Sequence, residues 1–292
     1  MQIINNTKYQ AALFMLLSAL FYSIEYYNVK SISCYYGIWT IGFVRGLSGI
    51  LPVFLTYFCK PIKPIYGYEI KKLFIFGLIS GISIIASFFA VKNLNLSLAS
   101  LLLSTSTLMT GIFSSFYNKK LWNVYDTIGT ILCIFGLITI IYKGFKNTND
   151  NYFIGILSSV VYIIFCALAN ITIMEKVKEE NTLVITLYAG ASSMILSTFG
   201  MINENINRNI VLSTNLIKLF VIGILSFCTL SFRIKSIQIS NTLGVIILRY
   251  TNIIWTLLLD IFLLHSHFNY YDAVGIILIL LGCFISYHKY NN

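Results

Sequence analysis

The chain has 292 residues, of which 58% are hydrophobic and only 10% are charged. A soluble domain of this length carries far more charge, because one core cannot bury so much apolar side chain. These proportions exclude a water-soluble globular protein and predict an integral membrane protein.

The formal net charge of +10 raises nucleic acid as a partner. The Lys and Arg residues, however, stand singly or in pairs at the ends of apolar runs, whereas a surface that binds nucleic acid gathers them into one patch. Cations at the ends of apolar runs are the residues that orient membrane spans. We therefore expect the lipid bilayer as a partner and no nucleic acid.

Ten segments are long and apolar enough to cross a bilayer, which takes about 20 residues in a helix. In chain order they lie near residues 9–27, 35–58, 71–91, 97–117, 124–142, 153–174, 183–202, 216–234, 240–264 and 272–288. Backbone groups in lipid must bond within their own segment, so helices are expected rather than strands. No small-residue cleavage signal follows the first segment, which favours a span over a removable signal peptide.

The orientation of the spans follows from the charges that flank them. Outside the span interiors, twelve Lys and Arg residues lie on the side of the N-terminus and six on the other side. The side richer in these residues is usually cytoplasmic. We therefore expect a multi-pass protein of a bacterial inner (plasma) membrane, with both termini in the cytoplasm.

The two halves of the chain repeat one pattern. The motif Y-D-x-x-G-x6-G begins at Tyr125 and again at Tyr271, 146 residues later, and a weaker similarity links 92–97 with 235–240. The chain thus divides into repeats at 1–146 and 147–292. Because each repeat holds five spans, the second is expected to be inverted, as in transporters whose substrate site lies at the repeat interface. The predicted fold is all-α, with ten transmembrane helices as two inverted five-helix repeats.

Four charged residues fall inside the predicted spans, namely Glu25, Arg45, Arg249 and Asp260. A charge at the centre of a span costs about 2.5–3.5 kcal/mol on insertion scales, so all four should face the interior of the bundle. Polar residues also recur at helical spacing on three spans. These stripes are Ser18, Tyr22 and Glu25; Ser100, Ser104, Thr107, Gly111 and Ser114; and Arg249, Asn252, Thr256 and Asp260. They predict a water-filled cavity between the first, second, fourth and ninth spans.

The chemistry of these side chains indicates the kind of substrate. The planar guanidinium group of arginine binds two oxygens of a carboxylate or phosphate. Arg45 and Arg249 are therefore predicted to bind an anionic group of a small-molecule substrate, and Glu25 or Asp260 an amine or a coupling proton. The other candidate substrate-binding residues are Tyr22, Trp39, Tyr250, Asn252, Trp255 and Thr256.

Two structural alternatives stay open for these residues. The charged residues can form interior ion pairs, Arg45 with Glu25 and Arg249 with Asp260, that only stabilise the packing. The aromatic residues can belong to the packing or to an interfacial belt.

The sequence lacks the motifs of common catalytic and nucleotide-binding sites. HExxH, G-x-S-x-G and the Walker A loop are absent. Zinc-dependent proteolysis, serine hydrolysis and nucleotide binding of these types each depend on the residue spacing of the motif. The six cysteines have no CxxC spacing, and no span carries a cluster of carboxylates. We therefore expect no enzyme activity, no metal and no cofactor.

These features resemble one known family, the EamA-type permeases of the drug/metabolite transporter superfamily. The resemblance rests on the five-plus-five duplication, F-V-R-G at 43–46, L-R-Y-T-N-I-I-W at 248–255 and a glycine-spaced last span in each half. The family usually has an acidic turn after the fourth and ninth spans, where this chain has Y-N-K-K at 117–120 and L-H-S-H at 264–267. The resemblance implies a secondary transporter that moves a small polar or amphoteric metabolite, such as an amino acid or an S-adenosylmethionine-like compound, by alternating access.

Two other functions remain open. A lipid flippase or membrane-embedded lipid-modifying enzyme predicts a polar stripe that opens sideways to lipid. A receptor or assembly partner predicts no cavity that a substrate can enter. Homodimerisation is left open as well.

Overall fold

The computed structural model describes residues 2–59, 67–118, 127–129, 131–132, 135–136, 138–139, 150–202, 214–240, 248–264 and 270–291. In these ranges every regular element is a helix, as backbone in lipid requires. The elements are α1 (Gln2–Ile32), α2 (Ile38–Cys59), α3 (Ile70–Asn93), α4 (Leu96–Ser104), α5 (Ser106–Asn118), α7 (Asp150–Glu175), α8 (Thr182–Met201), α9 (Thr214–Ile239), the 3-10 helix η2 (Leu248–Tyr250), α11 (Thr251–Leu263) and α12 (Tyr270–Asn291).

Seven segments of the described chain are long and apolar enough to cross a membrane. They are Tyr9–Ile32, Ile38–Thr56, Ile70–Asn93, Leu96–Ser114, Asn151–Glu175, Thr182–Met201 and Ile217–Ile239. Each overlaps one of the predicted spans, and the chain is therefore a multi-pass membrane protein.

The other three predicted spans are described in part. In segment 124–142 the described residues 127–129, 131–132, 135–136 and 138–139 are helical. Residues 241–247 of the ninth span lie outside the described residues. The remainder of the ninth span, 248–263, is helical, and α12 covers the tenth with the apolar stretch Ala273–Gly282. The total of ten spans stays a prediction.

The fourth span differs from the continuous helix that was predicted. α4 ends at Ser104 and α5 begins at Ser106, because the backbone N–H of Thr105 bonds to the carbonyls of Leu102 and Leu103 in a tighter turn. Hydroxyl groups in this run also bond to the backbone, as Thr105 does to Leu102, and such bonds compete with the regular helical pattern. The ninth span has a 3-10 turn, η2, at the position that corresponds to Thr105 in the repeat. A tight turn with a helix on both sides, as at Thr105, often marks a functional hinge.

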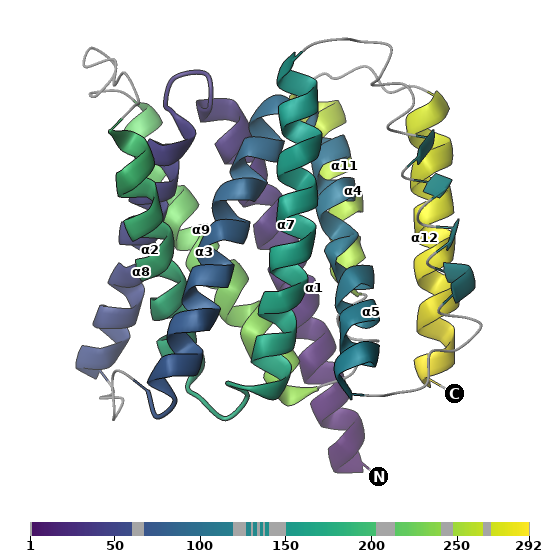
Figure 1. Ribbon diagram of the computed structural model, residues 1–292, viewed down its shortest axis with the longest axis horizontal. Coiled ribbons are helices and arrows are strands. Elements are labelled where there is room, and N and C mark those ends of the chain that lie inside the picture. The colour runs from purple at the N-terminus through teal and green to yellow at the C-terminus, as the bar shows by residue number, and fades with distance from the viewer. Residues whose placement is uncertain are drawn as a thin grey trace.

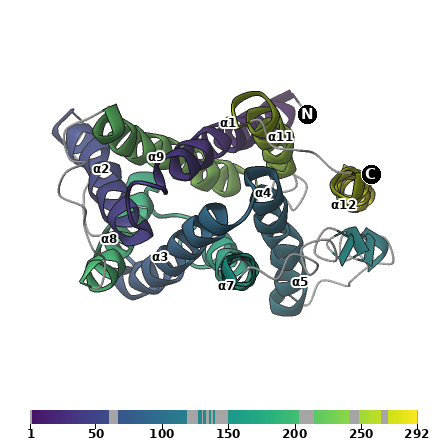
Figure 2. The same ribbon diagram turned by 90° about the horizontal axis from the view of Figure 1, so that it is seen from above.

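Both ends of the chain lie at the same end of the bundle. α1 begins and α12 ends at the lower edge of Figure 1, and we call this the termini end and the opposite one the far end. Seen from above, α2, α9, α1 and α11 form one row, and α8, α3, α7 and α5 form a second row that faces it (Figure 2).

Helices of the first half pack mainly against helices of the second half. α1 lies against α9 and α3 against α7, while α2 packs on α8. The contact of α2 with α9 has its counterpart in the contact of α8 with α3. The contact of α1 with α11 likewise has its counterpart in the contact of α7 with α5. Exchanging the two halves therefore turns each of these packing pairs into a pair of the same set, and the pair of α2 with α8 into itself. A two-fold structural repeat predicts this pattern.

Gly46 allows α2 to approach α8 closely. A Cβ atom at Gly46 would lie 2.8 Å from the carbonyl oxygen of Gly190 and 2.9 Å from the backbone nitrogen of Met194. A Cβ atom at Gly49, one turn later on α2, would meet only the carbonyl oxygen of Gly223 at 3.9 Å. The two glycines therefore form a matched pair, since only the first is required by the packing.

We expect Gly46→Ala to lower the free energy of unfolding by about 1–3 kcal/mol, which is typical of overpacking. Gly49→Ala should leave it unchanged or raise it slightly, because alanine favours the helix. Both variants gain the same helix propensity, so the difference between their melting temperatures in detergent reports the packing alone. Equal melting temperatures would contradict the close contact of α2 with α8.

Candidate functional site

Arg45 on α2 and Glu25 on α1 form an ion pair inside the bundle. Nε of Arg45 lies 3.2 Å from Oε1 of Glu25 and donates to the hydroxyl of Ser226 on α9 at 2.7 Å. The Ser226 hydroxyl also donates to the Glu25 carboxylate. The guanidinium carbon lies 5.7 Å from the ring centroid of Phe88 on α3. Arg45 therefore has its counterion within the protein, which is the ion-pair alternative considered for these two residues.

Little space remains beside this ion pair. The cavity there measures about 10 Å³, which is room for about one water molecule. Its walls come from α2, α8 and α9 through Arg45, Gly49, Thr186, Gly190, Ser226, Phe227 and Leu230. In this conformation the space beside Arg45 holds no metabolite.

Arg249 on η2 has a different environment. Its Nη2 donates to the hydroxyl of Tyr162 on α7 at 2.6 Å, and its Nη1 lies 3.5 Å from Sγ of Cys166. Its Cζ stands 4.7 Å from the ring centroid of Tyr22 on α1, a cation–π contact. The residue is only 2% exposed. The ion pairs of the described residues include no carboxylate partner for Arg249, so the alternative pair with Asp260 is not formed.

Three tyrosine hydroxyls meet beside Arg249. The hydroxyl of Tyr22 lies 2.9 Å from that of Tyr162 and is also hydrogen-bonded to the hydroxyl of Tyr26. Tyr22 and Tyr26 come from α1 and Tyr162 from α7, so this polar group joins the two halves of the chain. The predicted site residue Tyr22 thus contacts the predicted site residue Arg249.

Sequence reasoning missed two helices that build this region. Tyr162, Cys166 and Asn170 follow one another at intervals of four on α7 and share a helix face. Arg233 was one of the twelve cations counted above as lying outside the span interiors on the side of the N-terminus. It is buried inside α9, and its Nη1 lies 3.9 Å from Sγ of Cys166. The polar spacing on the sixth span was the signal that could have revealed α7. The sixth and eighth spans must therefore be added to the predicted cavity walls.

The buried polar stripe of α11 faces the stripe of α4. The bonds are Ser104 Oγ to Asn252 Oδ1 at 2.9 Å, Ser100 Oγ with Thr256 Oγ1 at 2.6 Å, and Ser97 N and Oγ to Asp260 Oδ2 at 2.9 and 2.6 Å. We call these six residues the α4–α11 polar interface. Two stripes that were predicted to line a cavity are thus bonded to each other, as polar side chains in membranes bond between helices.

Asp260 also stabilises the beginning of α4. Its carboxylate accepts from the backbone N–H of Ser97 in the first turn, where a negative charge is favourable. Lys30 on α1 donates to the carbonyls of Lys92 and Leu94, at 2.9 and 2.6 Å, where α3 ends. The α3–α4 turn at the far end is therefore held between α1 and α11.

The other aromatic candidates have three separate environments. Tyr250 is buried and packs with Leu101 and Ile253. Trp255 is 42% exposed, on the side of α11 away from its buried polar stripe. Trp39 stacks edge-on against Phe89 at 5.4 Å between ring centroids. These three positions differ in their surroundings, so the aromatic candidates do not form one cage.

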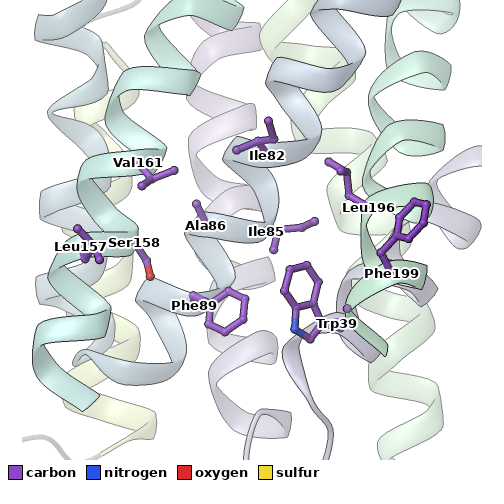
Figure 3. A pocket seen from close by; sticks show the side chains of 11 residues that line it. Trp39, Ile82, Ile85, Ala86, Phe89, Leu157, Ser158, Val161, Leu196 and Phe199 are labelled. Atoms are coloured by element: carbon purple, nitrogen blue, oxygen red, sulfur yellow. The ribbon is translucent and has the colours of Figure 1, made fainter. Parts of the chain in front are cut away.

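Trp39 belongs to an apolar groove between α3, α7 and α8. The groove measures about 590 Å³ and is lined by Trp39, Ile82, Ile85, Ala86, Phe89, Leu157, Ser158, Val161, Leu196, Phe199 and Gly200. Figure 3 shows the rings of Trp39 and Phe89 next to each other and the Ser158 hydroxyl among apolar side chains. None of the four predicted charged residues lines it. The groove is thus chemically distinct from the region around Arg249.

Several buried polar atoms of the described helices have no hydrogen-bond partner. Among them are Arg233 Nε, Ser106 Oγ, Asn170 Oδ1 and Asn252 Nδ2. Buried polar atoms in native proteins are nearly always bonded to protein or to ordered water. These atoms therefore mark positions where water or the polar groups of a solute complete the bonding.

Comparison with known proteins identifies the fold and the family. One crystal structure matches 99% of this chain and 98% of its own, with a TM-score of 0.67 and 14% sequence identity, a likeness that shows the fold alone. No curated protein matches the sequence. The EamA-like transporter family model matches twice, over residues 10–142 and 153–288. Since these two matches span most of the chain and one falls in each half, the chain belongs to the EamA-like transporter family.

Proposed function

We propose that this chain is a secondary transporter that moves a small metabolite with an anionic group by alternating access, and that Arg249 binds the anion. The observation that supports this most directly is the contrast between two buried arginines. Arg45 has Glu25 as its counterion, whereas Arg249 contacts only hydroxyl, thiol and aromatic groups of the described residues. A buried charge without a partner is unfavourable, and charges inside membranes usually serve function. An incoming anion supplies the missing counterion.

The α4–α11 polar interface is the proposed gate at the far end. Apart from Asp260 its side chains are neutral, and each such hydrogen bond contributes only about 0.5–1.5 kcal/mol, so the interface can open and close. The break at Thr105 and the 3-10 turn η2 give both helices a hinge. Because the packing pairs map onto one another when the halves are exchanged, an equivalent movement at the termini end would expose the other side.

The lipid flippase alternative requires a polar path that opens sideways. The groove that contains Trp39 is lined almost wholly by apolar side chains and holds none of the four charged residues. It does not supply such a path. We therefore keep the metabolite carrier as the single proposal.

A disulfide across the gate should stop transport. The hydroxyl oxygens of Ser100 and Thr256 are 2.6 Å apart, so cysteines at both positions lie close enough for oxidation. We expect the S100C/T256C protein to lose solute uptake into proteoliposomes after oxidation and to regain it after reduction. The test solute is the compound that most raises the melting temperature among amino acids, nucleosides and S-adenosylmethionine, because ligands of the folded state stabilise it.

The native cysteines need a control in this experiment. The wild type and the two single variants receive the same oxidant, and their uptake before and after oxidation should be equal. Quantitatively cross-linked S100C/T256C protein that still takes up solute at its reduced rate would contradict alternating access through this interface.

A further inference from the structure

A second buried arginine, Arg233 on α9, lies close to Arg249. The Nη1 atoms of both approach the same sulfur atom of Cys166, at 3.9 Å for Arg233 and 3.5 Å for Arg249. Arg233 is 7% exposed and lies within the span Ile217–Ile239. Two guanidinium groups from different helices thus converge on one point in the interior of the bundle.

These two positive charges lack a negative partner in the ranges that the structure describes. The ion pairs found there are Arg45 with Glu25 and Lys72 with Glu69. Nε of Arg233 is buried and has no hydrogen-bond partner at all. A thiol is only a weak acceptor, and like charges this close repel each other strongly in a medium of low dielectric constant. An anion bound between the two guanidinium groups would remove both problems.

The surrounding groups favour a ligand that is rich in acceptor oxygens. Arginine offers five N–H donors and no acceptor, and the hydroxyls of Tyr162 and Tyr22, 2.9 Å apart, stand beside Arg249. A carboxylate would neutralise one guanidinium group. A phosphate monoester carries about 1.5 to 2 negative charges and three acceptor oxygens, which matches two arginines.

We propose that Arg233 and Arg249 together bind a doubly charged oxyanion of the transported solute, namely a phosphate monoester. This group replaces the Cys166 thiol as their common acceptor. The inference rests on the proposed function, since it assigns the class of solute to the same site. Arg249 alone selects an anion, whereas the pair selects a dianion. A phospholipid headgroup offers the same phosphate chemistry, so the test includes both sources.

The test measures anion-dependent thermal stabilisation of the purified protein in detergent at pH 8 and matched ionic strength. The probes are glycerol 3-phosphate, acetate and dioctanoyl phosphatidic acid. Wild-type protein should bind glycerol 3-phosphate at least about tenfold more tightly than acetate, because charge-assisted bonds to both arginines add up. The lipid should bind no more tightly than glycerol 3-phosphate. Equal affinity for the dianion and the monoanion, or stabilisation by the lipid alone, would overturn the proposal.

Variants of Arg233 separate this inference from the proposed function. Arg233→Gln should weaken glycerol 3-phosphate binding by about tenfold or more and change acetate binding by less than about twofold, because Arg249 remains. Arg233→Lys keeps the charge without the planar fork, should lose an intermediate part of the preference, and replaces the glutamine variant if that one misfolds. Lys72→Gln removes the same charge at an exposed site on α3 and should bind like the wild type.

Different measurements would contradict the dianion site and the carrier function. A dianion preference that survives in both Arg233 variants overturns the dianion site and leaves the carrier intact. The carrier itself fails only in uptake, when oxidised S100C/T256C protein still transports.

Discussion

Replacement of Arg249 by glutamine should reduce solute uptake into proteoliposomes by about 10- to 100-fold, since a hydrogen bond to a charged group contributes about 1.5–3 kcal/mol. The folded protein should nevertheless lose no more than about 1 kcal/mol of stability. Its bonds to Tyr162 and Cys166 disappear, but so does the unfavourable burial of a charge without a carboxylate partner. Loss of function without loss of stability is typical of a binding residue.

Uptake and melting temperature are measured on the same preparations of wild type and Arg249→Gln protein. Lys72→Gln is the matched control, because it removes one positive charge from an exposed position outside the bundle interior. Uptake by the Arg249 variant at the wild-type rate, at equal reconstitution, would rule out Arg249 as the anion-binding group.

Glu25→Gln, in contrast to Arg249→Gln, should mainly affect stability. It should lower the free energy of unfolding by about 3–5 kcal/mol, because it leaves Arg45 as a buried charge without a counterion. The contact with Ser226 and the ring of Phe88 cannot replace the lost carboxylate. The double variant E25Q/R45Q removes both charges and should recover a large part of this loss, since the two residues act as one unit.

Melting temperature and the yield of monodisperse protein in detergent measure this effect for both single variants and the double variant. The comparison with Arg249→Gln is informative, because both changes affect a charged residue that is buried in the bundle. If Glu25→Gln melts within a degree of the wild type, or if the double variant is no more stable than the single one, the ion pair does not hold α1, α2 and α9 together.

Hydropathy predicted most of the spans correctly because it depends on the solvent and on each residue by itself. A segment that enters lipid must be apolar over its whole length, whichever helix it later contacts. The seven helices of the described residues that are long and apolar enough to cross a membrane all lie where apolar runs were found. The similarity between the halves likewise followed from residues such as Tyr125 and Tyr271 alone, and the packing pairs later agreed with it.

The ends and interruptions of helices were harder to predict from the sequence. The eighth span was predicted to end at residue 234, and Arg233, one residue before that end, was counted with the flanking charges, whereas α9 continues to Ile239. The break at Thr105 could not be seen in the hydropathy, since serine and threonine are tolerated in membrane helices. The break depends on which backbone carbonyl accepts a hydrogen bond from each hydroxyl. Helix boundaries are accordingly the weakest part of a hydropathy analysis.

The sequence by itself determined that the chain lies in a membrane, where most spans run, that two halves repeat, and that four charged residues lie in the predicted spans. Only the tertiary structure decided how these charges differ. Arg45 and Arg249 look equivalent in the sequence, as single arginines in apolar spans, yet α1 brings a carboxylate to the first and α7 brings a thiol and a hydroxyl to the second. The physical reason is that the pairing of charges depends on the rotation and contact of helices from both halves, which no local pattern encodes.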